Sequence, residues 1–150
     1  MKTPAFLFSF FLFFGLAFSG QAQTPQISIK GEKVMVNNYH YAYLVKNGSV
    51  WIKDFSFQSR KNEELVYAKA ITREMPNGHV YDYYEITFTG YTQKAEMDMK
   101  PDFGKRLAFE MVLYKMVKDD LLNPESVEKF LARYPANISK RLNNSEYKLQ

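Results

Sequence analysis

The chain has 150 residues, enough for a single domain with a core of its own, and it contains no cysteine. The lack of cysteine excludes disulfides, zinc ribbons, iron–sulfur clusters and thiol nucleophiles. The formal net charge is +4, but lysine and arginine are spread along the chain without a run of five, so the concentrated basic face that nucleic-acid binding requires is not expected.

The first 22 residues have the pattern of a secretory signal peptide. Lys2 supplies a positive start, residues 4–18 are almost continuously apolar, and small residues precede a predicted cleavage site after Ala22. The apolar run is shorter than the ~20 residues that span a bilayer, so no stable membrane insertion is expected after cleavage. An uncleaved N-terminal anchor is the alternative. We therefore predict a secreted or periplasmic protein.

Two alternating segments near the start of the mature chain predict a first hairpin. Residues 27–29 and 34–36 flank Gly31-Glu32, which suits a two-residue turn with glycine first. This pairing gathers the aliphatic side chains of both strands on one face.

The dipeptide Asn47-Gly48 predicts a second hairpin, because it lies between two alternating runs and is the strongest short-range hairpin signal. With these two residues as the turn, Leu44 lies opposite Trp51 and His40 lies opposite Phe55. We expect that face to be the core face of the sheet.

Residues 65–74 and 80–89 predict a third hairpin around a turn that contains Pro76 and Gly78. Small residues oppose large ones on one face, and oppositely charged residues meet on the other. The predicted pairs are Val66 with Phe88, Ala68 with Ile86, Ala70 with Tyr84, Lys69 with Glu85, and Arg73 with Tyr81. Residues 92–99 predict one more strand.

Two helices follow the strands. The first runs from Phe103 to about Asp119 with Asp102 as its cap, and two apolar stripes predict burial on both sides. The stripes are Phe109, Val112, Leu113 and Met116, and Leu107, Met111 and Tyr114. The second helix starts at Asn123-Pro124-Glu125 and ends at Pro135, with an apolar stripe of Val127, Phe130, Leu131 and Tyr134.

This order of elements predicts the α+β class: an antiparallel sheet of about 5–7 strands, built from consecutive hairpins, with two C-terminal helices packed on one face. The predicted organisation is a signal peptide at 1–22, a single domain at 23–135 and a polar C-terminal tail at 136–150. The tail has a short helical turn near residues 138–142 as its only expected structure.

The sequence carries no motif for catalysis, a cofactor or a metal. Its two histidines, His40 and His79, have no metal-ligand spacing, and the acids Asp54, Asp82 and Glu85 are not paired by any spacing in the chain. We therefore predict no catalytic residue, no metal site and no cofactor.

Three tyrosines stand out in residues 39–43. Alternate spacing places Tyr39, Tyr41 and Tyr43 on one strand face, where rigid aromatic rings suit binding, and Asp54 from the next strand can hydrogen-bond a ligand there. These four residues are the predicted ligand-binding site. The alternative is that tyrosine simply suits a half-buried strand.

Three functions remain open. The first is a non-enzymatic exported protein that binds an envelope protein or glycan through the tyrosine face. The second is a small secreted or periplasmic hydrolase with carboxylates from separate strands. The third is an oligomeric envelope component that uses the second stripe of the helix at Phe103 as its interface. The sequence favours the first and leaves the oligomeric state undetermined.

Overall fold

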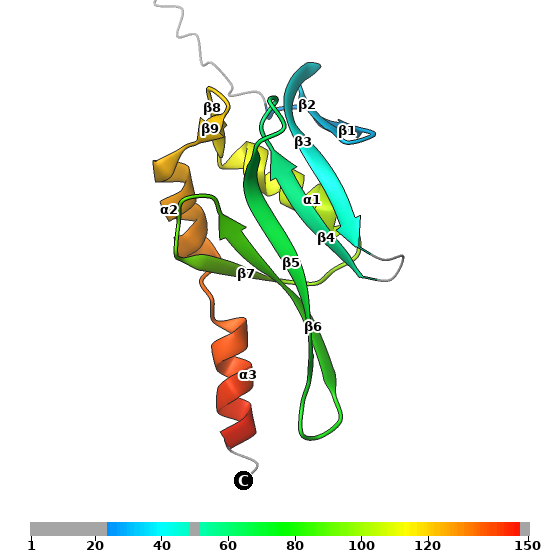
Figure 1. Cartoon of the computed structure of the whole chain (residues 1–150), viewed down its shortest axis with the longest axis vertical. Helices are drawn as coiled ribbons and strands as arrows, with labels where there is room; N and C mark the ends of the chain where they lie inside the picture. The colour runs from blue at the N-terminus through cyan, green and yellow to red at the C-terminus, as the bar shows by residue number, and fades with distance from the viewer. Residues whose placement is uncertain (1–23, 49–51, 148–150) are drawn as a thin grey trace, which may run out of the picture.

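A seven-stranded antiparallel sheet, with its strands in chain order, forms the body of the molecule (Figure 1). The structure, a computed structural model, describes residues 24–48 and 52–147. The strands are β1 (Ile27–Lys30), β2 (Lys33–Val36), β3 (Tyr39–Gly48), β4 (Lys53–Gln58), β5 (Glu64–Glu74), β6 (Val80–Phe88) and β7 (Lys94–Asp98). The predicted α+β class and the sheet of consecutive hairpins are confirmed.

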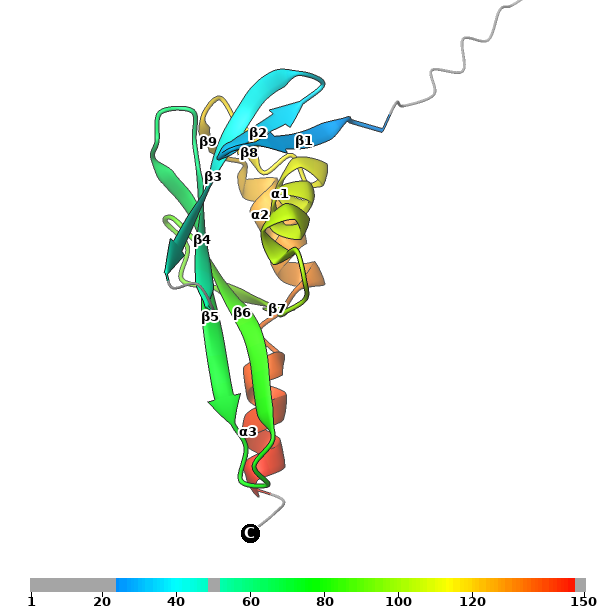
Figure 2. The same ribbon diagram turned by 90° about the vertical axis from the view of Figure 1, so that its right-hand side faces the viewer.

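Helices α1 (Phe103–Leu113) and α2 (Pro124–Arg133) cover one face of the sheet (Figure 2). A two-stranded ribbon, β8 (Val117–Lys118) and β9 (Leu121–Leu122), connects them. Helix α3 (Ile138–Tyr147) lies beside the long β5–β6 hairpin, where the Arg141 guanidinium donates to the Tyr81 hydroxyl at 3.1 Å. The segment predicted as a polar tail thus contains a ten-residue helix.

None of the helices in this described range is long and apolar enough to cross a membrane. Residues 1–22, which carry the prediction of export, lie outside the described residues, and so does Trp51.

The core lies between the helix-facing side of the sheet and helices α1 and α2. Alternate residues of the central strands point into it, and both helices contribute one apolar face. Fully or almost fully buried members include Leu44, Phe57, Val66, Ile86, Leu107, Met111, Val127 and Phe130.

The first and third hairpins form as predicted. Strands β1 and β2 pair around Gly31, whose φ of 62° is the conformation that a turn with glycine first requires. In the β5–β6 hairpin every predicted pair is observed, from Val66 with Phe88 to Arg73 with Tyr81.

The predicted turn at Asn47-Gly48 is wrong, because both residues belong to β3. Leu44 pairs with Phe57, a shift of six residues from the prediction. An even shift keeps Leu44, Phe55 and Phe57 on the face predicted for them. Gly48 serves a different purpose: a Cβ there would lie 2.7 Å from the Ile52 carbonyl oxygen.

A turn that the sequence analysis missed connects β2 to β3. Asn37 and Asn38 both have left-handed backbones, with φ of 50° and 68°, and Val36 pairs with Tyr39 across them. Asparagine tolerates this conformation better than most residues, so a two-residue hairpin forms without glycine.

Helix α1 begins at Phe103 as predicted, but it ends at Leu113 rather than Asp119. Lys115 adopts φ 52° beyond its end, and the Met116 N–H donates to the Met111 carbonyl at 2.8 Å, which closes the helix with a Schellman motif. The predicted cap also fails, since Asp102 makes no side-chain capping bond.

Burial of both stripes of α1 is wrong in part. Leu107, Met111 and Val112 are buried, whereas Phe109 is 44% exposed and Leu113 is 54% exposed. One face of α1 therefore carries two large apolar side chains that no described element covers. Helix α2 begins at Pro124 as predicted and buries its apolar stripe.

Candidate functional site

The three predicted site tyrosines do not share one face. Strand β3 contains a bulge: Val34 pairs with Ala42 and Met35 pairs with His40, which leaves Tyr41 as the extra residue. The bulge turns Tyr41 toward α1 and the core, where its ring centroid lies 6.4 Å from that of Phe57.

The Tyr41 hydroxyl ties β3 to the segment after α1. It accepts a hydrogen bond from the Val117 N–H at 2.9 Å and lies 3.4 Å from the Val117 carbonyl oxygen. Burial raises the pKa of Tyr41, while the hydrogen bond with the Val117 backbone acts in the opposite direction. These contacts give Tyr41 a structural role.

Tyr43 and His40 lie against each other instead, with ring centroids 4.5 Å apart. The prediction that His40 faces Phe55 is wrong, because Phe55 pairs with Lys46. Tyr39 is 80% exposed beside the β2–β3 turn. Ligand binding by Tyr39 and Tyr43 stays a prediction, but the continuous ladder of three rings on which it was based is wrong.

Asp54, the fourth predicted site residue, lies on the outer face of the sheet, away from α1. Its carboxylate accepts hydrogen bonds from the Tyr67 hydroxyl at 2.7 Å and from the Ala70 N–H at 2.8 Å. The bond with Asp54 raises the pKa of Tyr67 to about 12. Asp54 is thus already bonded within the sheet, and its role in ligand binding stays a prediction.

The carboxylates of the hydrolase hypothesis do not meet. Asp82 lies on the helix-facing side with Tyr84, whereas Asp54 lies on the outer face, so the sheet separates them. Glu85 bonds the Lys94 ammonium at 2.9 Å. Within the described residues, no three histidine or acidic side chains gather as a metal site would require.

A cavity of about 770 Å³ opens between the helix-facing side of the sheet and the first turn of α1. Strands β1, β3, β4 and β6 and the segment that connects β7 to α1 contribute to it. Its apolar lining consists of Ile29, Leu44, Phe55, Tyr84, Met99 and Phe103, and its charged lining consists of Lys46, Lys53, Asp82, Lys100, Asp102 and Lys105.

Three aromatic rings give the cavity a rigid floor. The Tyr84 and Phe103 rings are stacked 3.6 Å apart, and the Phe55 centroid lies within 6 Å of both. Gly104 allows α1 to approach this floor, because a Cβ there would lie 2.4 Å from the Phe55 ring. The Tyr84 hydroxyl donates to the Lys53 carbonyl at 3.0 Å, which fixes the start of β4 beside the rings.

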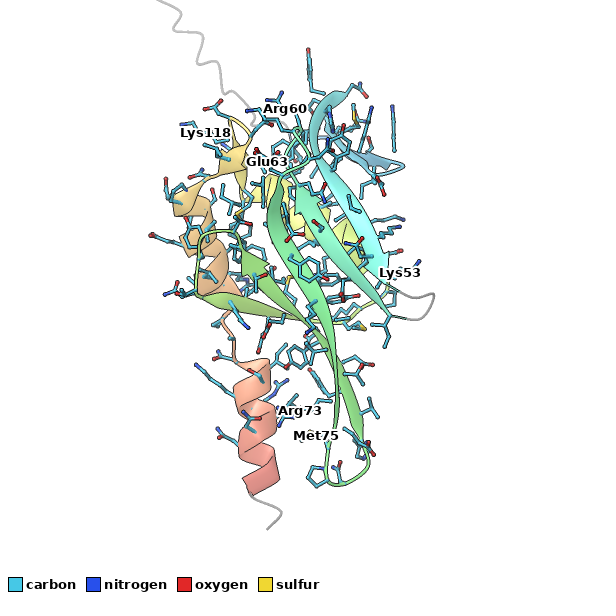
Figure 3. All side chains as sticks on the ribbon, viewed as in Figure 1. Lys53, Arg60, Glu63, Arg73, Met75 and Lys118 are labelled. Carbon is cyan, nitrogen blue, oxygen red and sulfur yellow. The ribbon has the colours of Figure 1, made fainter. Side chains whose placement is uncertain are left out.

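Strand alternation places two lysines at the cavity rim. Lys46 pairs with Phe55 on the helix-facing side, and Lys53, two residues before Phe55 at the start of β4, lies on the same side and is labelled in Figure 3. Lys100 and Lys105 come from the chain that leads into α1. Lys46, Lys53 and Lys100 form no ion pair with another described residue.

The two acids of the lining have other partners. Asp82 accepts a hydrogen bond from the Thr72 hydroxyl at 2.7 Å, and Asp102 lies 3.9 Å from the Lys105 ammonium. The cavity therefore combines an apolar aromatic floor with a rim of cations, which suits binding rather than proton transfer.

Sequence reasoning did not identify this cavity, although one signal was available. Even in the predicted register, Lys53 lies on the strand face that was assigned to the core. A lysine on an otherwise apolar face indicates that this part of the face is open to solvent. The contributions of α1 and of the segment before it could not be inferred, because they depend on how the helix docks.

We compared the chain with models of known protein families, with curated proteins and with solved structures, and none of the three comparisons gave a match.

Proposed function

We propose that this protein is a non-enzymatic binding protein whose ligand site is the cavity at the first turn of α1. The observation that carries the proposal is a cavity of about 770 Å³ in which an aromatic floor adjoins lysines without ion-pair partners. Ligand pockets typically have ~300–1,000 Å³ and an apolar lining with a few polar groups that orient the ligand.

The hydrolase hypothesis receives less support. It requires two titratable groups held together, and Asp54 and Asp82 are on opposite faces of the sheet. Export remains part of our proposal on the strength of residues 1–22 alone, and the ligand source would then be an envelope protein, glycan or other envelope molecule.

A fragment screen followed by amide chemical-shift mapping tests the proposal. We expect fragments to shift signals of cavity residues such as Lys46, Phe55 and Gly104. The Met99→Trp variant places an indole in the cavity and should abolish these shifts. Leu121→Trp, which adds the same side chain at an exposed position outside the cavity, should leave them unchanged. Shifts scattered over the surface, or unaffected by Met99→Trp, would contradict the proposal.

Self-association is a second candidate function, but not through the stripe first expected to form the interface, since its members Leu107 and Met111 are buried in the core. On the exposed face of α1, Phe109 and Leu113 are one helical turn apart and together form an apolar patch. If the protein assembles through this face, sedimentation should give a mass that rises with concentration, and Phe109→Ser should return it to that of a monomer. Val80→Ser, at an apolar position that is also exposed, is the matched control.

A further inference from the structure

The charges around the cavity do not balance. Four lysines and two aspartates line it, so the lining carries a formal excess of two positive charges. Asp102 partners Lys105 and Asp82 bonds Thr72, which leaves the ammonium groups of Lys46, Lys53 and Lys100 as the groups that a ligand can satisfy. An anionic group is the chemical complement of such a rim.

The rim carries lysine rather than arginine, and this affects the geometry with which an anion can be bound. An ammonium is a compact point charge on a flexible stem and contacts a phosphate or carboxylate without a fixed bidentate geometry. Lys46, Lys53 and Lys100 line the same cavity from β3, β4 and the segment before α1, and their flexible stems allow them to contact a single phosphate or carboxylate.

The floor of the cavity sets a second requirement. Phe55, Tyr84 and Phe103 form a ring cluster that is 3–6% exposed, and the partly buried Ile29 and Met99 extend it with aliphatic surface. A small inorganic anion would leave the partly exposed Ile29 and Met99 in contact with water, whereas an apolar body covers them and the ring edges and gains ~25 cal/mol for each Å² removed from water.

We infer that the cavity binds an anionic amphiphile, a molecule with one phosphate or carboxylate group attached to an apolar body. This inference rests on the proposed binding function and specifies its ligand class. The anionic group lies among Lys46, Lys53 and Lys100, and the apolar body lies on Ile29, Met99 and the edges of the ring cluster.

Calorimetric titration of a chain of residues 23–150 with four probes tests both halves of the inference. The probes are decyl phosphate below its micelle concentration, decanol, decyltrimethylammonium and inorganic phosphate. We expect decyl phosphate to bind roughly tenfold or more tightly than each of the others, and its affinity to fall with added salt because the rim is exposed to solvent.

A matched pair of double variants locates the anionic group. Lys46→Gln/Lys53→Gln should weaken decyl phosphate binding roughly tenfold, since two cation contacts of a partly exposed site are lost. Lys61→Gln/Lys118→Gln removes the same charge outside the cavity, with Lys118 far from Lys53 in Figure 3, and should leave binding unchanged.

Each contrary outcome identifies what fails. If decanol binds as tightly as decyl phosphate, or if both double variants behave alike, the anion requirement is overturned while the proposed binding function stands. If inorganic phosphate binds as tightly, the apolar requirement is overturned. If no probe binds, the inference is overturned as a whole, and the fragment screen decides separately whether the cavity binds anything.

Discussion

On the outer face of the sheet, Asp54 accepts hydrogen bonds from Tyr67 and Ala70, whereas at the cavity on the helix-facing side Lys46 and Lys53 have no ion pair with another described residue. The outer face continues in the same manner: the Ser56 hydroxyl donates to Glu64 at 2.7 Å. Both regions hold polar groups beside aromatic rings. On the outer face these groups bond to one another, whereas Lys46 and Lys53 at the cavity have no ion-pair partner among the described residues.

This contrast between the two faces distinguishes polar groups that stabilise the fold from polar groups that are available to a ligand. A partly buried carboxylate with two donors contributes to stability and would have to lose a bond before it met a ligand. Cations without partners contribute little to folding and repel one another. We therefore expect substitutions on the outer face to lower stability and substitutions at the rim to affect binding.

The largest expected effect is on the free energy of unfolding, and it should differ between Tyr41 and Tyr43. The bulge directs these two side chains to opposite faces of the sheet. Tyr41→Ala removes a ring packed on Phe57 and leaves the Val117 N–H without its acceptor, so we expect a loss of about 3 kcal/mol of unfolding free energy. Tyr43→Ala, on the outer face, should cost less than about 1 kcal/mol. Urea denaturation measures both, and equal losses would contradict the bulge.

Gly104→Ala tests the close approach of α1 to the cavity floor. The added methyl group would overlap the Phe55 ring, and such overpacking costs about 1–3 kcal/mol, offset in part by the better helix propensity of alanine. Lys105→Ala, at the next and exposed position, should change the melting temperature little. Unchanged stability of Gly104→Ala would mean that α1 does not contact Phe55 in this way.

The Tyr67–Asp54 bond on the outer face predicts a pH dependence. Its effect raises the pKa of Tyr67 from the ordinary value of 10.0 to about 12. Below pH ~10 the hydroxyl is protonated in the folded and the unfolded chain, so the bond contributes fully. Between pH ~10 and ~12 the unfolded chain loses this proton first, so stability falls as the pH rises.

Tyr67→Phe checks this sign, because it removes the titrating hydroxyl and keeps the ring. We expect the variant to be less stable than the original chain at pH 8 and to lose less stability between pH 10 and 12. Denaturant midpoints measured across that interval give the comparison, and parallel curves for the two proteins would show that the bond is not formed.

The smallest expected effect on stability comes from the cavity rim. Lys46→Gln/Lys53→Gln removes two cations that have no described partners, so the free energy of unfolding should change by no more than about 0.5 kcal/mol. A loss of 2 kcal/mol or more would show that these lysines stabilise the fold, and the contrast between the two faces would fail.

The elements that could be predicted from the sequence are those fixed by local pairing. In the β5–β6 hairpin, Ala68 meets Ile86 on one face and Lys69 meets Glu85 on the other, so a slipped register would have disturbed both faces. The first hairpin followed from its turn at Gly31, and the start of α2 followed from proline at the first helical position, although Asn123 makes no side-chain capping bond.

The misassigned features depend on tertiary contacts. Gly48 resembles a turn residue, but it is needed because the Ile52 carbonyl approaches it. The bulge at Tyr41 arises from how β2 pairs with β3, and α1 ends at a left-handed Lys115 where glycine or asparagine is the usual signal. The cavity needs the docked α1, so strand alternation alone could supply only Lys46 and Lys53.

Chemical-shift mapping with decyl phosphate shows whether the ligand binds at the cavity or on the outer face, because it compares the two faces of the sheet in one experiment. A ¹⁵N-labelled chain of residues 23–150 is titrated below the micelle concentration of the probe. We predict that the largest shifts fall on Lys46, Lys53, Tyr84 and Gly104 and that the signals of Tyr43 and Tyr67 stay in place. Shifts concentrated on Tyr43 and Tyr67, with the cavity signals unmoved, would contradict the account.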